Sequence, residues 1–345
     1  MTRYLLLFAF AGSLSAQPTP PGKLVDLGGH KLHVNCTGKG SPTVIVENGF
    51  DEFSSDWILV QSEVEKFTRI CTYDRAGYAW SDPGPKPRTF AQINLELHNA
   101  LKQLGERGPF VLVGHSFGGP VARNYALTYP KEVAGLMLVE SVSDDQRVGI
   151  GNGKTIRIAD DATGKPIPKP HEQMTLADKP KRTEGHDFTD LKIEPPYDRL
   201  PEKQQKMWLW ALVQPEREDA SNSEREWSCE YLARWLKDPS SGSLGDLPLI
   251  VLTREKGGYP DGWDVPAAEL ERQRLAGQTA LVKLSSKGQQ RILSSGHDMH
   301  LEAPDEVTEA IREMVDQIHK PTHSKQKAGA IAPTFSESPG LTRRR

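Results

Sequence analysis

One serine in this chain has the surroundings of a catalytic nucleophile. Ser116 is the centre of the segment Gly-His-Ser-Phe-Gly at residues 114–118. The short apolar run at residues 110–113 predicts a buried strand, and residues 120–129 predict a helix. A Gly-x-Ser-x-Gly turn between a strand and a helix exposes the serine hydroxyl and directs the first amides of the helix toward the place where an anion would form. We therefore expect Ser116 to act as a nucleophile.

A serine hydroxyl is a weak nucleophile at neutral pH and needs a base to take its proton. Among the ten histidines, His297 is the best candidate, because it follows a predicted strand at residues 290–293 and a glycine. Its ring can therefore project over the end of the sheet where Ser116 lies. His300 is the alternative base, and His115 is expected to be structural. The sequence has no convincing metal-ligand spacing and no phosphate-binding glycine loop, so no metal or cofactor is predicted.

The elements that must position these residues follow an α/β pattern. Predicted strands and helices alternate up to residue 140, which indicates a mostly parallel sheet with helices on both faces. Residues 141–246 interrupt the pattern with an irregular part and a helical part rich in tryptophan and tyrosine. We predict a core of residues 17–140 and 247–319, with residues 141–246 as a cap over the site. The cap aromatics either line a substrate pocket or pack the cap on the core.

Four segments resemble motifs of the α/β-hydrolase fold family, in the family's order and spacing: Glu47-Asn48-Gly49-Phe50, residues 73–82, residues 114–119 and residues 295–304. The resemblance covers about residues 24–319. It implies an eight-stranded, mostly parallel sheet flanked by helices and a triad of serine, acid and histidine. It also implies an oxyanion hole formed by the amides of Phe50 and Phe117. Asn48 stands where members usually have a histidine.

The acid is where the sequence departs most from the family. Its usual place, a few residues past the strand at residues 249–253, falls near Gly257, which is not a carboxylate. A minority arrangement in the superfamily puts the acid at the end of the strand before the cap. That position is Glu140, which we favour as the acid. The alternatives are Glu255, Asp261 and Asp264.

A serine at this turn, where some relatives have aspartate, predicts an acyl-enzyme and hydrolysis of a small carboxylic ester. An amide or peptide hydrolase and an acyltransferase are alternative enzymes, and a non-catalytic binding protein on the same fold is the alternative from another class. The net charge of −3 and the lack of a long basic block argue against a nucleic acid partner. The sequence specifies neither the acyl and alcohol groups nor the oligomeric state.

The first 16 residues are typical of a secretory signal, with Arg3, a short apolar run and small residues before Gln17. The apolar run is too short to span a bilayer. We therefore expect an exported, periplasmic or extracellular protein. The family's strand order places the second and fourth strands side by side, so the resemblance implies a Cys36–Cys71 disulfide with Cys229 free. Residues 320–345 have little apolar content and predict a disordered tail.

Overall fold

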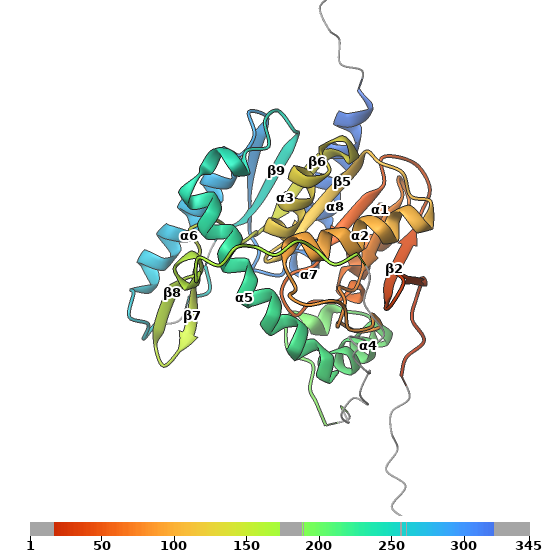
Figure 1. Cartoon of the computed structure of the whole chain (residues 1–345), viewed down its shortest axis with the longest axis horizontal. Coiled ribbons are helices and arrows are strands. Elements are labelled where there is room, and N and C mark those ends of the chain that lie inside the picture. Colours follow the sequence, from red (N-terminus) through yellow and green to blue (C-terminus); the bar gives the residue numbers. More distant parts are fainter. Residues whose placement is uncertain (1–16, 173–187, 189, 256, 260, 321–345) are drawn as a thin grey trace, which may run out of the picture.

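The computed structural model describes residues 17–172, 188, 190–255, 257–259 and 261–320. The predicted signal sequence, residues 1–16, lies outside these ranges, as does the predicted tail except for residue 320. Eight strands form the main sheet of the described part, in the order β1-β2-β4-β3-β5-β6-β9-β10 (Figure 1). β2 is antiparallel to both of its neighbours, and all other neighbouring pairs are parallel. The predicted α/β class with a mostly parallel eight-stranded sheet is confirmed.

The strands of the main sheet are β1 (Lys23–Asp26), β2 (Lys31–Thr37), β3 (Val44–Glu47), β4 (Ile70–Tyr73), β5 (Phe110–His115), β6 (Val133–Val139), β9 (Leu249–Arg254) and β10 (Gly288–Leu293). The α-helices are α1 (Ile58–Val64), α2 (Phe90–Leu104), α3 (Gly118–Thr128), α4 (Glu202–Leu212), α5 (Pro215–Lys237), α6 (Ala267–Val282), α7 (Met299–Glu302) and α8 (Pro304–His319). A separate hairpin consists of β7 (Arg147–Gly151) and β8 (Lys154–Arg157). Short 3-10 helices are η1 (Ser54–Trp57), η2 (Pro130–Glu132), η3 (Ile158–Asp161), η5 (Tyr197–Arg199) and η6 (Pro239–Gly242).

Alternating side chains of the central strands enter two separate apolar cores. Val111 and Val113 of β5 pack with α1 and α8 on one face, whereas Phe110 and Leu112 pack with α2 and α3 on the other. This alternation follows from the two-residue repeat of a strand. Because both faces are covered, the central strands are mostly apolar, as expected for a parallel sheet, and polar Glu47 and His115 stand only at their ends.

Helix α2 illustrates how the sequence sets the length and the direction of these layers. The Thr89 side chain accepts the amide of Gln92 at the start of the helix, and Gly105 ends it in the left-handed conformation, with φ of +77°. These are the residue types favoured at the two ends of a helix. Buried Ile93 and Leu97, four residues apart, lie on one face and pack toward the molecule's interior.

The segment between β6 and β9 contains the β7–β8 hairpin and helices α4 and α5. In Figure 1, α4 lies below the sheet, and α5 runs from α4 up toward α3. Arg123 of α3 lies over the ring of Trp235 in α5, with its guanidinium carbon 4.1 Å from the ring centroid. Trp210 of α4 and Trp235 of α5 are buried. No helix in the described ranges has both the length and the apolar character needed to cross a membrane.

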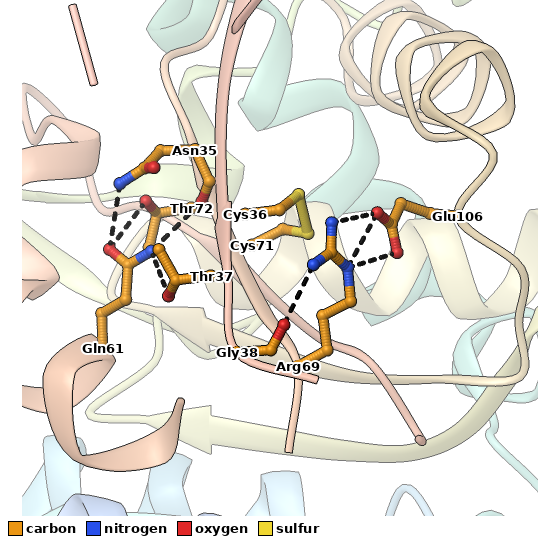
Figure 2. The surroundings of a disulfide bond; sticks show 9 residues. All are labelled: Asn35, Cys36, Thr37, Gly38, Gln61, Arg69, Cys71, Thr72 and Glu106. Carbon is orange, nitrogen blue, oxygen red and sulfur yellow. Dashed lines mark hydrogen bonds and ion pairs between the residues drawn. A yellow bond between two sulfur atoms is a disulfide. The ribbon is translucent and has the colours of Figure 1, made fainter. Parts of the chain in front are cut away.

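Two of the three cysteines are joined across neighbouring strands. Cys36 of β2 lies directly opposite Cys71 of β4, with 4.0 Å between their Cα atoms, and the two form a disulfide (Figure 2). Cys229 is a free, buried thiol. The predicted pairing is therefore confirmed, and a disulfide indicates an oxidising compartment.

Polar contacts flank the disulfide on both sides (Figure 2). On one side Arg69 forms an ion pair with Glu106, with 2.6 Å between Nη2 and Oε1. On the other side the side-chain Nε2 of Gln61 donates to the Asn35 carbonyl and to the Thr37 hydroxyl. These contacts attach β2 and β4 to their neighbours beyond the sheet ladder.

Candidate functional site

Ser116 lies in a tight turn between β5 and α3. Its φ is +48°, in the left-handed region that residues with a side chain rarely adopt. A Cβ on Gly114 would lie 2.6 Å from the Gly118 carbonyl oxygen, and one on Gly118 would lie 2.2 Å from the Glu47 carbonyl oxygen. Only glycine fits at either position, because the backbones approach so closely. The turn therefore presents Ser116 at the carboxyl ends of the strands.

The loop after β3 lies against this turn. The Asn48 side chain donates to the Tyr73 carbonyl over 2.7 Å, which anchors the loop on β4 and gives Asn48 a positioning role. The two residues whose amides were predicted to bind an oxyanion are neighbours, since the rings of Phe50 and Phe117 meet edge to face with centroids 5.7 Å apart. Phe117 immediately precedes α3. The loop and the start of the helix thus face each other beside Ser116.

The predicted base, His297, lies beside the same turn. Its ring centroid is 4.8 Å from that of His115, which directly precedes Ser116. Burial, followed by the positive charge of His115, lowers the pKa of His297 to about 3. His297 is therefore neutral at neutral pH, which is the form that can accept a proton from a serine hydroxyl.

His115 itself forms a buried ion pair that the sequence did not reveal. Its Nδ1 lies 2.5 Å from Oε1 of Glu52, and its Nε2 lies 2.9 Å from the carbonyl oxygen of His297. A carboxylate and a carbonyl only accept, so both ring nitrogens carry protons and the ring is an imidazolium. Burial opposes this charge, but the attraction of Glu52 outweighs it and raises the pKa of His115 to about 9.

Glu52 completes a link between the two loops. Burial alone would raise the pKa of its carboxyl, but His115 lowers the pKa to about 2. Its second oxygen accepts the amide of Gly49 over 2.6 Å. The pair of Glu52 and His115 therefore joins the loop before Phe50 to the turn and to the backbone of His297.

The described residues include one buried group with ligand atoms of a kind that metals bind. Atoms of Glu52, His115 and His300 lie within 4.8 Å of one another. However, both nitrogens of His115 already donate hydrogen bonds, and His300 stacks on Trp57 with ring centroids 4.7 Å apart. The arrangement is that of an ion pair beside a packed imidazole. His300, the alternative base, is fully buried in this packing.

The favoured acid, Glu140, lies directly after β6 and is held by two arginines. Its Oε2 accepts the backbone amide of Arg254 over 2.9 Å, and its Oε1 lies 2.8 Å from Nη1 of Arg274 and 3.1 Å from Nε of Arg254. Within the described ranges, no hydrogen bond joins Glu140 to His297. Glu140 thus ties β6 to β9 and α6, and its role as the acid stays a prediction.

The other carboxylates considered from the sequence lie elsewhere or are exposed. Asp264 accepts both the amide and the hydroxyl of Thr155 in β8, each over 2.9 Å, and Glu255 and Asp261 are exposed. A carboxylate that the sequence analysis did not single out is Asp298. One of its oxygens lies within 4.8 Å of a ring nitrogen of His297, and burial raises the pKa of its carboxyl to about 6.

Aromatic side chains of α5 share an apolar cluster with Phe117 of the turn and contact it through Phe90 of α2. Phe90 packs on Phe117 with centroids 5.6 Å apart and on Tyr231 of α5 with centroids 4.6 Å apart. Trp235 of α5 belongs to the same apolar cluster. Tyr231 and Trp235 are therefore packed in the same cluster as Phe117.

The chain is similar to proteins of known family. The model of a family described as the alpha/beta hydrolase family matches residues 44–310. An uncharacterized protein of Schizosaccharomyces pombe is 31% identical over 169 residues, which are 40% of this chain and 31% of that protein's length. The chain thus spans less than a third of that curated relative.

Solved structures with the same fold match most of the chain. One is a thermophilic esterase from Thermogutta terrifontis, which is 22% identical, covers 84% of this chain and 95% of its own, and has a TM-score of 0.56. Another is the enol-lactonase from Burkholderia xenovorans, which is 17% identical, covers 84% of this chain and 97% of its own, and has a TM-score of 0.55. At these identities, the likeness establishes the shared fold.

Proposed function

Because the chain belongs to the alpha/beta hydrolase family, we propose that it is a serine hydrolase that cleaves a small carboxylic ester through an acyl-enzyme. The observation that carries the proposal is the strained turn at Ser116 next to a partly buried, neutral His297. A left-handed serine between a strand and a helix is expensive to maintain and is typical of a nucleophile.

The reaction then follows from the arrangement of the residues. His297 takes the proton of Ser116 as the serine oxygen attacks the carbonyl carbon of the ester. The carbonyl oxygen becomes an oxyanion, which accepts hydrogen bonds from the amides of Phe50 and Phe117. The protonated His297 gives its proton to the departing alcohol, which leaves the acyl group on Ser116. His297 then activates a water molecule, which releases the acid and regenerates the serine.

Glu140 is the acid that we propose for this triad. It sits where the strand before α4 and α5 ends, and its carboxylate is next to Arg254, whose charge also acts on His297. A carboxylate offers about four acceptor positions, so its contacts with the two arginines leave room for one more donor. This role is independent of the proposed nucleophile and base, and it is tested separately.

Two alternative enzymes would use the same residues: an amide or peptide hydrolase and an acyltransferase. A non-catalytic binding protein would keep the fold without turnover. The named esterase and enol-lactonase among the similar structures favour an ester.

We further propose that residues 141–246 limit substrate size, because Tyr231 and Trp235 belong to the same apolar cluster as Phe117. The disulfide supports export from the cytoplasm.

Covalent labelling tests the proposal directly. A fluorophosphonate should modify Ser116 of the full chain, and Ser116→Ala should abolish both the labelling and the turnover of p-nitrophenyl esters while the melting temperature is kept. A panel of esters with increasing acyl length then separates an esterase from the alternatives. A folded wild-type protein that neither reacts with the probe nor cleaves any ester of the panel would exclude the proposed activity.

A further inference from the structure

We propose that Arg75 positions the oxyanion loop and that Glu224 of α5 keeps Arg75 in place, so that α5 helps to organise the oxyanion hole. This inference rests on the proposed function. Neither residue is predicted to touch the substrate, and both act through the backbone that carries Phe50.

Every N–H group of the Arg75 guanidinium donates a hydrogen bond. Nη1 donates to the carbonyl of Asn48 over 2.6 Å and to Oε1 of Glu47 over 3.1 Å. Nη2 donates to the carbonyl of Gly49 over 2.9 Å and to Glu224 over 3.1 Å, and Nε donates to Glu224 over 2.9 Å. Five N–H groups thus meet five acceptors, and such a planar fork fixes direction better than a lysine could.

The contact with Gly49 sets the direction of the Phe50 amide. A trans peptide unit is planar, with its carbonyl and its N–H pointing in opposite directions. Since the Gly49 carbonyl points at Arg75, the N–H of Phe50 in the same unit points away from Arg75. The guanidinium carbon also lies 5.3 Å from the ring centroid of Phe117. Arg75 therefore contacts the peptide unit that carries the Phe50 amide, through the Gly49 carbonyl, and the ring of Phe117.

Glu224 brings α5 into this arrangement. It is fully buried, accepts two hydrogen bonds from Arg75, and accepts a third from the Tyr78 hydroxyl over 2.8 Å. The chain separation between Arg75 and Glu224 is 149 residues. Glu47 pairs with Nη1 only, so loss of the Glu224 charge leaves Nε and Nη2 of this buried guanidinium without a carboxylate and should loosen the grip of Arg75 on the loop.

The test compares two conservative variants of α5 in the full chain. Glu224→Gln removes one of the two carboxylate charges that pair with Arg75 and leaves Glu47 in place. Glu230→Gln is the matched control, because Glu230 lies on the same helix, is also buried, and bonds to Thr163 within the segment between β6 and β9. For each variant we would measure kcat and KM for p-nitrophenyl butyrate, the melting temperature, and inhibition by trifluoromethyl hexyl ketone and methyl hexyl ketone.

The two ketones separate oxyanion binding from general pocket damage. The trifluoromethyl ketone adds to a serine and forms an oxyanion, whereas the methyl ketone mainly reports ground-state binding. We expect Glu224→Gln to lower kcat by about 10- to 100-fold and to weaken the trifluoromethyl ketone by a similar factor. KM and inhibition by the methyl ketone should change little, and Glu230→Gln should resemble the wild type.

Three results would overturn the inference. One is a folded Glu224→Gln variant with wild-type kcat, another is equal weakening of both ketones, and the third is the same loss in Glu230→Gln. If Glu224→Gln fails to fold, Tyr78→Phe, which removes one bond to Glu224 and no charge, takes its place and should show a smaller change of the same kind. An inactive wild-type protein would instead refute the proposed function, so the two failures are distinguishable.

Discussion

The side chain of His115 donates a hydrogen bond to the backbone carbonyl of His297, with 2.9 Å between Nε2 and the oxygen. Its other nitrogen is paired with Glu52, which accepts the amide of Gly49. One buried ion pair therefore links the nucleophile turn, the loop of the proposed base and the oxyanion loop. It also places a positive charge next to a neutral imidazole, and this has consequences that pH can reveal.

The pH dependence of turnover should be unusual on its acid side. Because burial and the charge of His115 lower the pKa of His297 to about 3, the base stays unprotonated well below the ordinary value of 6.5. We expect kcat/KM for a p-nitrophenyl ester to be nearly constant from about pH 8 down to about pH 5. Circular dichroism at each pH would show that the protein is folded. A half-maximal value near pH 6.5 would contradict the lowered pKa.

Removing the ion pair of Glu52 and His115 should move the pH at which kcat/KM falls on the acid side. In the double variant Glu52→Gln/His115→Gln, the amides preserve a hydrogen bond but His297 loses the neighbouring positive charge, which lowers its pKa more than Glu52 raises it. The acid limit of kcat/KM should therefore move to higher pH. The same exchange at His98 and Glu132, a partly exposed pair with 3.1 Å between Nδ1 and Oε2, serves as a control and should leave the profile unchanged. An unshifted limit in the first variant would remove His115 from the explanation.

Three histidines with shifted pKa values also predict how stability depends on pH. His115 has a raised pKa of about 9, so its contribution to folding is fully present below 6.5 and is lost as the pH rises toward 9. His297 and His300 have lowered pKa values of about 3, so the unfolded chain binds more protons and stability falls as the pH drops from 6.5 toward 3. Urea unfolding across this range should show highest stability near pH 6.5. The rise and fall should be absent in variants that lack these rings.

The sequence predicts local features of this site better than distant ones. The strand, turn and helix around Ser116 follow from residues within about 20 positions, because apolar runs and glycines report local geometry. The contacts of Arg75 with Glu224 and of His115 with Glu52 join residues 149 and 63 positions apart. Each of these charged residues looks like an ordinary surface residue in the sequence, since burial and pairing are set only by the folded chain.

The disulfide joins distant residues, yet it could be predicted from the resemblance to a known fold. No local pattern pairs Cys36 with Cys71, but the resemblance to a known strand order does, since it places β2 beside β4. Glu140 shows the limit of such transfer. Its position at the end of β6 could be predicted from the resemblance, whereas its partners Arg254 and Arg274 come from β9 and α6, far along the chain. A position in a fold therefore carries over more readily than the contacts made there.

The disulfide should contribute measurably to stability. Its ends are 35 positions apart, so the cross-link restricts the unfolded chain by an amount worth on the order of 3–4 kcal/mol in the loop-entropy model. We expect Cys36→Ala/Cys71→Ala to lower the free energy of unfolding by about this amount, measured with guanidinium chloride. Dithiothreitol should destabilise the wild type toward the double variant and leave the variant unchanged. Equal stability of the two oxidised proteins would contradict the prediction.

The last prediction separates a catalytic role of Glu140 from a structural one. If its carboxylate orients His297, Glu140→Gln should reduce kcat by roughly 10⁴-fold, as loss of the triad acid does elsewhere, because the wrong tautomer of the base is favoured. Glu255→Gln, which changes an exposed carboxylate nearby, should leave kcat unchanged. Melting temperatures are measured alongside, because Glu140 also faces two arginines.

Unchanged turnover with a lower melting temperature would show that Glu140 has a structural role. If Glu140→Gln keeps its turnover but melts at a lower temperature, Glu140 holds Arg254 and Arg274 and is not the triad acid. Asp298 is then the residue to change, since one of its oxygens lies within 4.8 Å of a His297 nitrogen. In that case Asp298→Asn, and not Glu140→Gln, should carry the large loss of kcat. If neither variant loses turnover, His297 works without a carboxylate partner, and the triad proposed here reduces to Ser116 and His297.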